Sequence, residues 1–294
     1  MLFGIAIRTG NGFFNLEVQL MKFLYFIMIF IIILILGKWR FNYFTNKEIA
    51  SLAAASENDP AMPVTQQRIE ALPLPVARWL TTTGMAGKHE IQSVRLKQTG
   101  LMKLKPSQKN WYQSNAEQYI TVNEPAFLWK AEIKMLPFLK VVGRDLFKHG
   151  RGHMTIKIAS LIPIVDIADN EKINQSTMQR YLLELPWYPS AALSPYIQWK
   201  QLDEFSAEAT MDYNGVSGSA TYQFSAEGSV EKISALRYKD SSKDAKLLEC
   251  VGEVVESSRI EGIEIPTALT VSWMLEEGRF TWYKVKVEDI KFNE

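Results

Sequence analysis

The sequence predicts a mainly β protein with some helix (α+β), whose curved antiparallel sheet is preceded by one transmembrane helix. Beyond Glu90, apolar and polar residues alternate with a period of two through most of the chain. Turn-forming residues separate these segments. Parallel strands would need a connecting helix between each pair, and the sequence has only two or three helical stretches. We expect roughly ten strands in a half-barrel or barrel-like sheet with two or three covering helices, because a sheet of that size must curl or split.

Composition limits the functional classes. The chain has 294 residues, of which 47% are hydrophobic and 22% charged, as in a globular protein with a sizeable core. A formal net charge of +1 provides no field that would attract nucleic acid. Cys250 is the only cysteine, so neither a disulfide within the chain nor a CxxC redox motif can form.

An unbroken apolar run from residue 23 to residue 36 predicts a membrane segment at residues 21–40. Lys22 and Lys38 flank it, and Trp39 suits a membrane interface. The alternative is a cleaved signal peptide, but the following GKWRF lacks the small residues of a cleavage site. We therefore expect a single-pass N-terminal anchor. The flanking charges differ too little to predict on which side of the membrane the domain lies.

The anchor divides the chain into four parts. Residues 1–20 form an N-terminal extension, which Met21 would remove if it were the true start. Residues 41–63 are expected to be a helical or flexible connector, and residues 64–294 a single β-rich domain. The domain is expected to open with a helix that is entered at Pro73 or Pro75, since proline is tolerated in the first turn of a helix.

Two segments give the clearest strand predictions. In the stretch from Phe127 to Met135, every second residue is apolar, which predicts one face turned to a core. Asn214 and Gly215 stand between two alternating runs, and Asn-Gly is the favoured pair for a tight type I′ hairpin turn.

One strongly helical segment, Ser176 to Leu193, interrupts the strands. Its apolar residues recur at helical spacing, Ser176 and Gln179 have the spacing of a capping box, and Pro186 ends the helix. Trp187 and Tyr188 follow as an aromatic corner. We expect this helix to cover an apolar, partly hollow concave face of the sheet.

Arg180 and Glu184 lie four residues apart on this helix, so their side chains can meet. The pair is either an ordinary surface ion pair or a cavity-facing pair that orients the polar end of a ligand. In the second interpretation, the aromatic corner lines the apolar part of the site. The candidate ligand-binding residues are Arg180, Glu184, Trp187, Tyr188, Trp129, Arg144 and Asp145.

The stretch from Gly143 to His153 is the most polar and glycine-rich in the chain. His149 and His153 could share a metal only on a helix, which the intervening glycines disfavour. A glycine-rich turn with Arg144 and Asp145 as a neighbouring pair is the preferred interpretation. Motifs for a nucleophile elbow, a phosphate loop or a dinucleotide site are absent from the sequence, so we predict no catalytic residue, metal or cofactor.

Three motifs together resemble an uncharacterised bacterial family of membrane-anchored proteins. They are LPLPVARWL at residues 72–80, the GRD of residues 143–145 and RYLLELPWYPSAAL at residues 180–193. His153 before Met154 departs from the family's second glycine motif. The resemblance implies bacterial origin and an N-terminal anchor, and it transfers no activity or catalytic residue.

Three functions are compatible with these features. The first is a membrane-anchored domain that binds a lipid or another apolar ligand between the curved sheet and the helix. The second is an interaction or scaffold module of the cell envelope, docking through the aromatic corner or a sheet edge. The third, a hydrolase or transferase that uses Arg144, Asp145, His149 or His153, has no motif in its favour.

Overall fold

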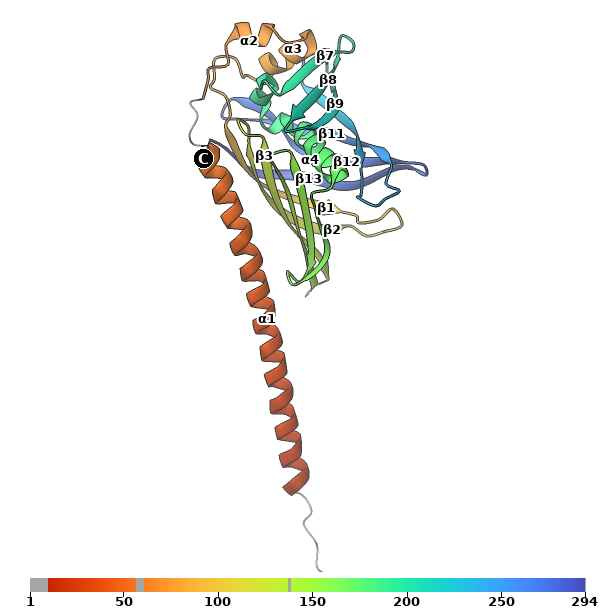
Figure 1. Cartoon of the computed structure of the whole chain (residues 1–294). Coiled ribbons are helices and arrows are strands. Elements are labelled where there is room, and N and C mark those ends of the chain that lie inside the picture. The colour runs from red at the N-terminus through yellow and green to blue at the C-terminus, as the bar shows by residue number, and fades with distance from the viewer. Residues whose placement is uncertain (1–9, 57–60, 137–138, 294) are drawn as a thin grey trace, which may run out of the picture.

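The computed structural model describes residues 10–56, 61–136 and 139–293. Residues 1–9 of the expected extension and residues 57–60 of the expected connector lie outside the described residues. The helices are α1 (Gly10–Ser56), α2 (Gln66–Glu70), α3 (Leu74–Thr82) and α4 (Glu171–Leu183), with short 3-10 helices η1 (Leu185–Trp187) and η2 (Pro189–Leu193). Figure 1 shows α1 as a long rod beside a β-rich domain.

Thirteen strands form one antiparallel sheet, three more than the approximate number that the alternation predicts. The first six are β1 (Ser93–Met102), β2 (Tyr112–Thr121), β3 (Ala126–Leu136), β4 (Leu139–Lys148), β5 (Arg151–Ile158) and β6 (Ile162–Ala168). The others are β7 (Ile197–Gln201), β8 (Ser206–Tyr213), β9 (Val216–Phe224), β10 (Val230–Tyr238), β11 (Leu247–Ile260), β12 (Ile263–Leu275) and β13 (Gly278–Phe292).

The order of the strands explains the position of α4. It runs β6-β5-β4-β3-β2-β1-β13-β12-β11-β10-β9-β8-β7, so β6 and β7 are the two edges although they follow each other in the chain. The segment that joins them must cross the sheet from edge to edge, and it carries α4, η1 and η2. Register shifts in several strand pairs, such as the one between Lys97 and Gln98, add curvature. The mainly β, curved open sheet with few helices is confirmed.

Local predictions also hold. Tyr213 pairs with Val216 across Asn214 and Gly215, and both turn residues have positive φ, as a type I′ turn requires. Helix α3 begins after Pro73 with Pro75 in its first turn, and its residue Trp79 is buried. Strand β3 buries Phe127 and Ala131 on the predicted face.

The N-cap of helix α4 lies six residues earlier than predicted. Its N-cap is Asn170, whose side chain accepts hydrogen bonds from the backbone N–H groups of Lys172 and Ile173. The predicted cap, Ser176, is instead buried within the helix and donates its hydroxyl hydrogen bond to the Tyr238 carbonyl. The α-helix ends at Leu183, and Pro186 lies in η1.

Helix α1 packs along the outer, convex face of β2 to β5. Leu52 is buried against Tyr119 and Leu128, which explains why Leu128 is buried although it faces away from the concave side. Arg144 of β4 forms a bidentate ion pair with Glu48. Helix α1 therefore continues past the apolar run to contact the domain, and residues 41–56 of the expected connector are helical.

Candidate functional site

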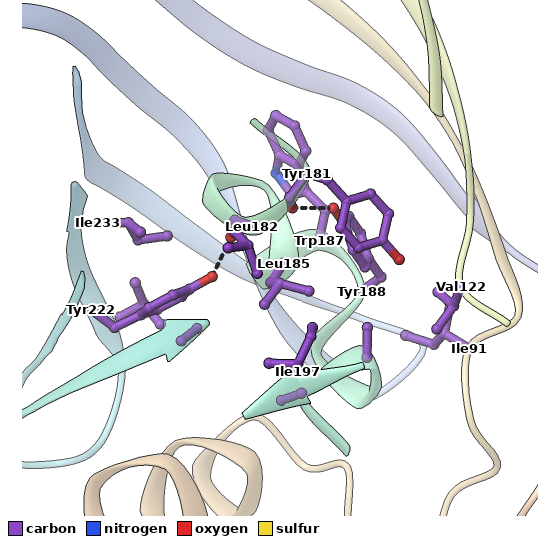
Figure 2. Close-up of a cluster of buried hydrophobic side chains, with 14 of the residues drawn as sticks. Ile91, Val122, Tyr181, Leu182, Leu185, Trp187, Tyr188, Ile197, Tyr222 and Ile233 are labelled. Carbon is purple, nitrogen blue, oxygen red and sulfur yellow. Dashed lines mark hydrogen bonds between the residues drawn. The ribbon is translucent and has the colours of Figure 1, made fainter. Parts of the chain in front are cut away.

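We call the part of the concave face that packs against α4, η1 and η2 the upper core. It contains Met178, Tyr181, Tyr188, Tyr222 and Trp79, all at most 1% exposed. Tyr188 donates a hydrogen bond to the Tyr181 carbonyl at 2.5 Å, and Tyr222 donates one to the Leu182 carbonyl (Figure 2). This half of the concave face is a packed interior, so the expectation of a hollow beneath the helix is wrong here.

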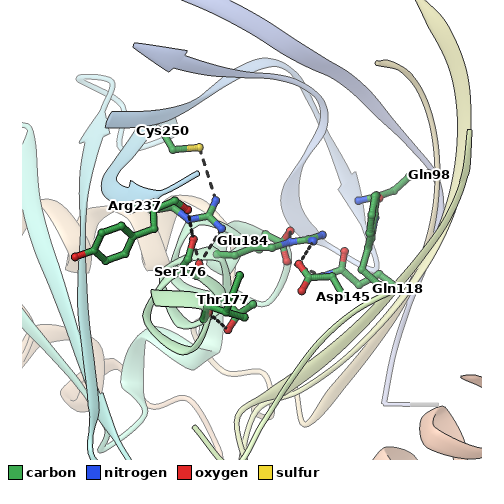
Figure 3. Close-up of polar contacts among 12 residues, drawn as sticks. Gln98, Gln118, Asp145, Ser176, Thr177, Glu184, Arg237 and Cys250 are labelled. Atoms are coloured by element: carbon green, nitrogen blue, oxygen red, sulfur yellow. Dashed lines mark hydrogen bonds and ion pairs between the residues drawn. The ribbon is translucent and has the colours of Figure 1, made fainter. Parts of the chain in front are cut away.

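A charged cluster lies where the last turn of α4 meets β2 and β4 (Figure 3). The guanidinium of Arg180 donates to Asp145 Oδ2 at 2.7 Å and to Glu184 Oε1 at 2.8 Å. Gln118 Nε2 donates to the other oxygen of Glu184 at 2.6 Å. The side chains of Arg180, Asp145 and Glu184 are only 17%, 6% and 13% exposed, so the interpretation of Arg180–Glu184 as a surface ion pair is wrong.

Aromatic rings hold Arg180 on its other side. Its Cζ lies 4.9 Å from the ring centroid of Phe127 and 4.8 Å from that of Trp129, within cation–π distance. Trp129 Nε1 in turn donates to Gln98 Oε1 at 3.0 Å. Burial opposes the charge on Arg180, but the two adjacent carboxylates outweigh it and raise its pKa. Arg180 is therefore a permanent cation held in a defined orientation.

The cluster leaves hydrogen-bond acceptors free. It sets one guanidinium against two carboxylates, and Asp145 Oδ1 and Gln118 Oε1 are buried without a partner among the described residues. A buried acceptor without a donor costs about 1–3 kcal/mol of stability. The presence of such unpartnered atoms in a folded protein calls for an explanation, and one explanation is a bound polar group that donates hydrogen bonds to them.

An apolar surface adjoins the cluster at Trp129. We call it the lower apolar surface. Its buried members are Met102, Ile133, Val141, Tyr283 and Val285, and its partly exposed members are Tyr112, Trp129, Met135, Ile156, Ile158, Leu269, Val271 and Trp282. In the strand register these residues lie on the same face as Asp145 and Gln118, apart from Trp282, which falls at a register shift of β13.

Further polar atoms on this surface have no hydrogen-bond partner in the part of the chain that the structure describes. They are Ser114 Oγ, Tyr283 OH and Trp282 Nε1, all buried. Burial raises the pKa of Tyr283 to about 12, and the nearby Ser114 hydroxyl acts in the opposite direction. The surface thus combines apolar contact area with buried polar side-chain atoms, of which the Ser114 and Tyr283 hydroxyls lie near each other.

The conserved domain of one protein family matches residues 70–292. The chain belongs to the DUF6920 family, a family of unknown function. This confirms the resemblance to an uncharacterised family. No curated protein matches the chain.

Two solved structures are similar to this DUF6920 chain. A LolA superfamily protein from Nitrosomonas europaea has a TM-score of 0.41 and 14% identity over 78% of this chain and 93% of that one. A beta-barrel-like protein of the DUF1849 family from Brucella abortus has a TM-score of 0.29 and 6% identity over 69% of this chain and 98% of that one.

The aromatic corner of the DUF6920 chain is part of the upper core. Trp187 is 6% exposed and donates to the Pro266 carbonyl at 3.0 Å, and Tyr188 is fully buried. Trp187 Nε1 and Tyr188 OH both donate hydrogen bonds within the protein, unlike the unpartnered acceptors Asp145 Oδ1 and Gln118 Oε1 of the cluster. The corner therefore anchors the α4 segment to β12.

Arg144 and Asp145 do not pair with each other, contrary to the predicted neighbouring pair. Adjacent residues of a strand point to opposite faces, so Asp145 reaches Arg180 on the concave side and Arg144 reaches Glu48 on the convex side. His149 occupies the β4–β5 turn with positive φ, and His153 contacts the exposed Asp166 at 2.8 Å. The two histidines do not meet the charged cluster.

Sequence reasoning missed Gln118, Gln98, Ser114 and Tyr283. The first three are polar residues at inward positions of β1 and β2, so they break the alternation that reveals an apolar face. The available signal was the register of β2 itself, since Ser114 and Gln118 share the face of buried Ile120.

Proposed function

We propose that this protein is membrane-anchored through α1 and binds one amphiphilic lipid on its concave face. The acyl chain would lie on the lower apolar surface, and the polar end would meet the cluster of Arg180, Asp145, Glu184 and Gln118. The observation that carries this proposal is the set of unpartnered buried polar atoms beside that surface. In the upper core, by contrast, the hydroxyls of Tyr181, Tyr188 and Tyr222 are satisfied within the protein, as is usual in a tightly packed interior.

Anchoring is supported by the length and composition of α1. Residues 18–54 are long and apolar enough to cross a membrane, and little of this segment is buried against the rest of the protein. Trp39 stacks on Tyr43 just after the apolar run, and both rings are exposed. Exposed aromatic residues at this position are typical of a membrane interface.

The unpartnered acceptor atoms of the cluster indicate which chemical group the polar end of the ligand would carry. Asp145 Oδ1 and Gln118 Oε1 accept hydrogen bonds, and the cluster carries one more carboxylate than cation. A hydroxyl or ammonium group complements this arrangement, whereas a free carboxylate would be repelled. We expect a neutral or zwitterionic lipid with a donor, such as a monoacylglycerol or an ethanolamine lipid, to bind more tightly than a fatty acid.

Photocrosslinking tests the proposal. The full chain, in detergent, is irradiated with a diazirine-bearing monoacylglycerol, and the modified peptides are mapped by mass spectrometry. We expect modification of β3, β5 or β12 and its loss in Val271→Arg, which places a charge on the lower apolar surface. Val255→Arg is the control because Val255 is already 60% exposed. Modification confined to α1 peptides would refute the proposal.

A further inference from the structure

Exposed apolar residues lie on β3 and β6 at one end of the sheet. Leu136 ends β3 and is 62% exposed, and Ile162 and Ile164 of the edge strand β6 are 62% and 54% exposed. The two strand ends are neighbours, because Leu136 pairs with Leu139 of β4 and the Ala159 N–H, just after β5, donates to the Lys140 carbonyl of β4. We call Leu136 and residues 161–164 the hairpin tip.

The hairpin tip contacts α1 where its apolar run ends. Leu161 packs against Gly37, and a Cβ atom at Gly37 would overlap the Leu161 side chain. Gly37 directly follows Leu36, the last residue of the run. One turn further along α1, Phe41 lies under Lys157 of β5, with Nζ 5.8 Å from the ring centroid. Figure 1 shows the strand ends beside the middle of α1.

This contact places the tip at a definite depth. A helix rises about 1.5 Å per residue, so the exposed side chains near Leu161 lie within a few ångströms of the end of the apolar run. If α1 spans a bilayer, that level is the boundary between acyl chains and headgroups. Lys38 and Lys134 are exposed near the same level and suit anionic headgroups.

We propose that the hairpin tip inserts into the bilayer that α1 spans, so that the lower apolar surface opens directly onto the membrane. Met135 and Ile158 belong to that surface, Met135 adjoins Leu136 in the chain, and Ile158 pairs with Ile162. Apolar contact is therefore continuous from the tip to the concave face. The insertion rests on the α1 contact and on the anchoring part of the proposed function, whereas the entry of a ligand along this route rests on its ligand-binding part.

Fluorescence of single labels in the full chain tests the insertion. Cys250 is fully buried, so a cysteine introduced by Ile162→Cys or Ile164→Cys takes an environment-sensitive thiol label selectively. The chain is reconstituted into phosphatidylethanolamine–phosphatidylglycerol vesicles with or without brominated acyl chains. We expect emission at shorter wavelength and quenching by the brominated lipid at both positions. Val255→Cys, on β11, is the matched exposed control and should respond only to aqueous iodide.

Two outcomes would overturn the insertion. Tip labels that iodide quenches as strongly as the Val255→Cys label would place the tip in water. Protection that rises with protein concentration and is insensitive to brominated lipid would indicate a second copy on the β6 edge. Quenching by brominated lipid together with no crosslink on β3, β5 or β12 would refute only the ligand proposal, so the two failures can be told apart.

Discussion

The upper core and the lower apolar surface share one concave face but differ in how they treat polar atoms. In the upper core, Tyr181, Tyr188 and Tyr222 each donate a hydrogen bond to a backbone carbonyl. On the lower surface, the Tyr283 hydroxyl and the Trp282 indole N–H are buried without such a bond. The comparison teaches that α4 covers one half of the face closely enough to satisfy these tyrosine hydroxyls, whereas the other half has buried polar side-chain atoms without a hydrogen-bond partner among the described residues.

Truncation of a buried aromatic should have the largest effect, and only in the upper core. Trp79 is 1% exposed and packs against Trp199, Tyr222 and Phe224. Trp79→Ala should lower the free energy of unfolding by about 3–5 kcal/mol. Met135→Ala on the partly exposed lower surface should cost about 1 kcal/mol. Urea unfolding followed by circular dichroism measures both, and equal losses would remove the distinction between the halves.

Removal of the Arg180 guanidinium, at the border of the two halves, should cause the second-largest loss of stability. Arg180→Met leaves Asp145 and Glu184 close together without their cation, and we expect a loss of about 3 kcal/mol at neutral pH. Arg151→Met is the matched control, because Arg151 and Asp169 form a pair that is more than two-thirds exposed. Its loss should stay below about 0.5 kcal/mol. Similar unfolding midpoints for the two variants would contradict the burial of the cluster.

Alkaline pH should weaken the upper core most. Burial raises the pKa of Tyr196 to about 12, and it raises the pKa values of Tyr181, Tyr188 and Tyr222 well above the ordinary value. The folded state therefore holds protons that the unfolded chain releases near pH 10, so stability falls as pH rises above about 10.

The contribution of a single hydroxyl to this pH dependence of stability can be measured. Tyr222→Phe should reduce it by up to about 1.4 kcal/mol per pH unit, the value for one proton. Urea titrations at several pH values between neutrality and strong alkali measure the slope. An unchanged slope would mean that the Tyr222 hydroxyl does not hold its proton more tightly in the folded state.

Removal of one hydroxyl from each half should change stability least, but it compares the two halves most directly. Tyr188→Phe removes a hydrogen bond to the Tyr181 carbonyl and should cost about 1 kcal/mol. Ser114→Ala removes a buried hydroxyl that makes no regular hydrogen bond, so stability should stay the same or rise slightly. Thermal unfolding of both variants without added lipid gives the comparison. A clear loss for Ser114→Ala would show that its hydroxyl is satisfied within the protein.

Strand β2 illustrates where the sequence was hard to interpret. Its inward residues Ser114 and Gln118 are polar, so its alternation does not reveal an apolar face. Strand β6 includes Pro163, a residue that disfavours a strand within a sheet, and only its position at the edge of the sheet makes the proline tolerable. The site and the tip therefore draw on two strands with an irregular local pattern, together with β3, whose alternation is regular.

The sequence by itself determined the features that depend on neighbouring residues. Alternation predicted the sheet, Asn214 and Gly215 predicted their hairpin, and proline predicted the start of α3. Only the tertiary structure decided which polar groups meet. Asp145 and Gln118 lie 35 and 66 residues from their partners on α4, and Arg144 lies 96 residues from Glu48. Such contacts depend on the order of strands in the sheet, which no local pattern encodes.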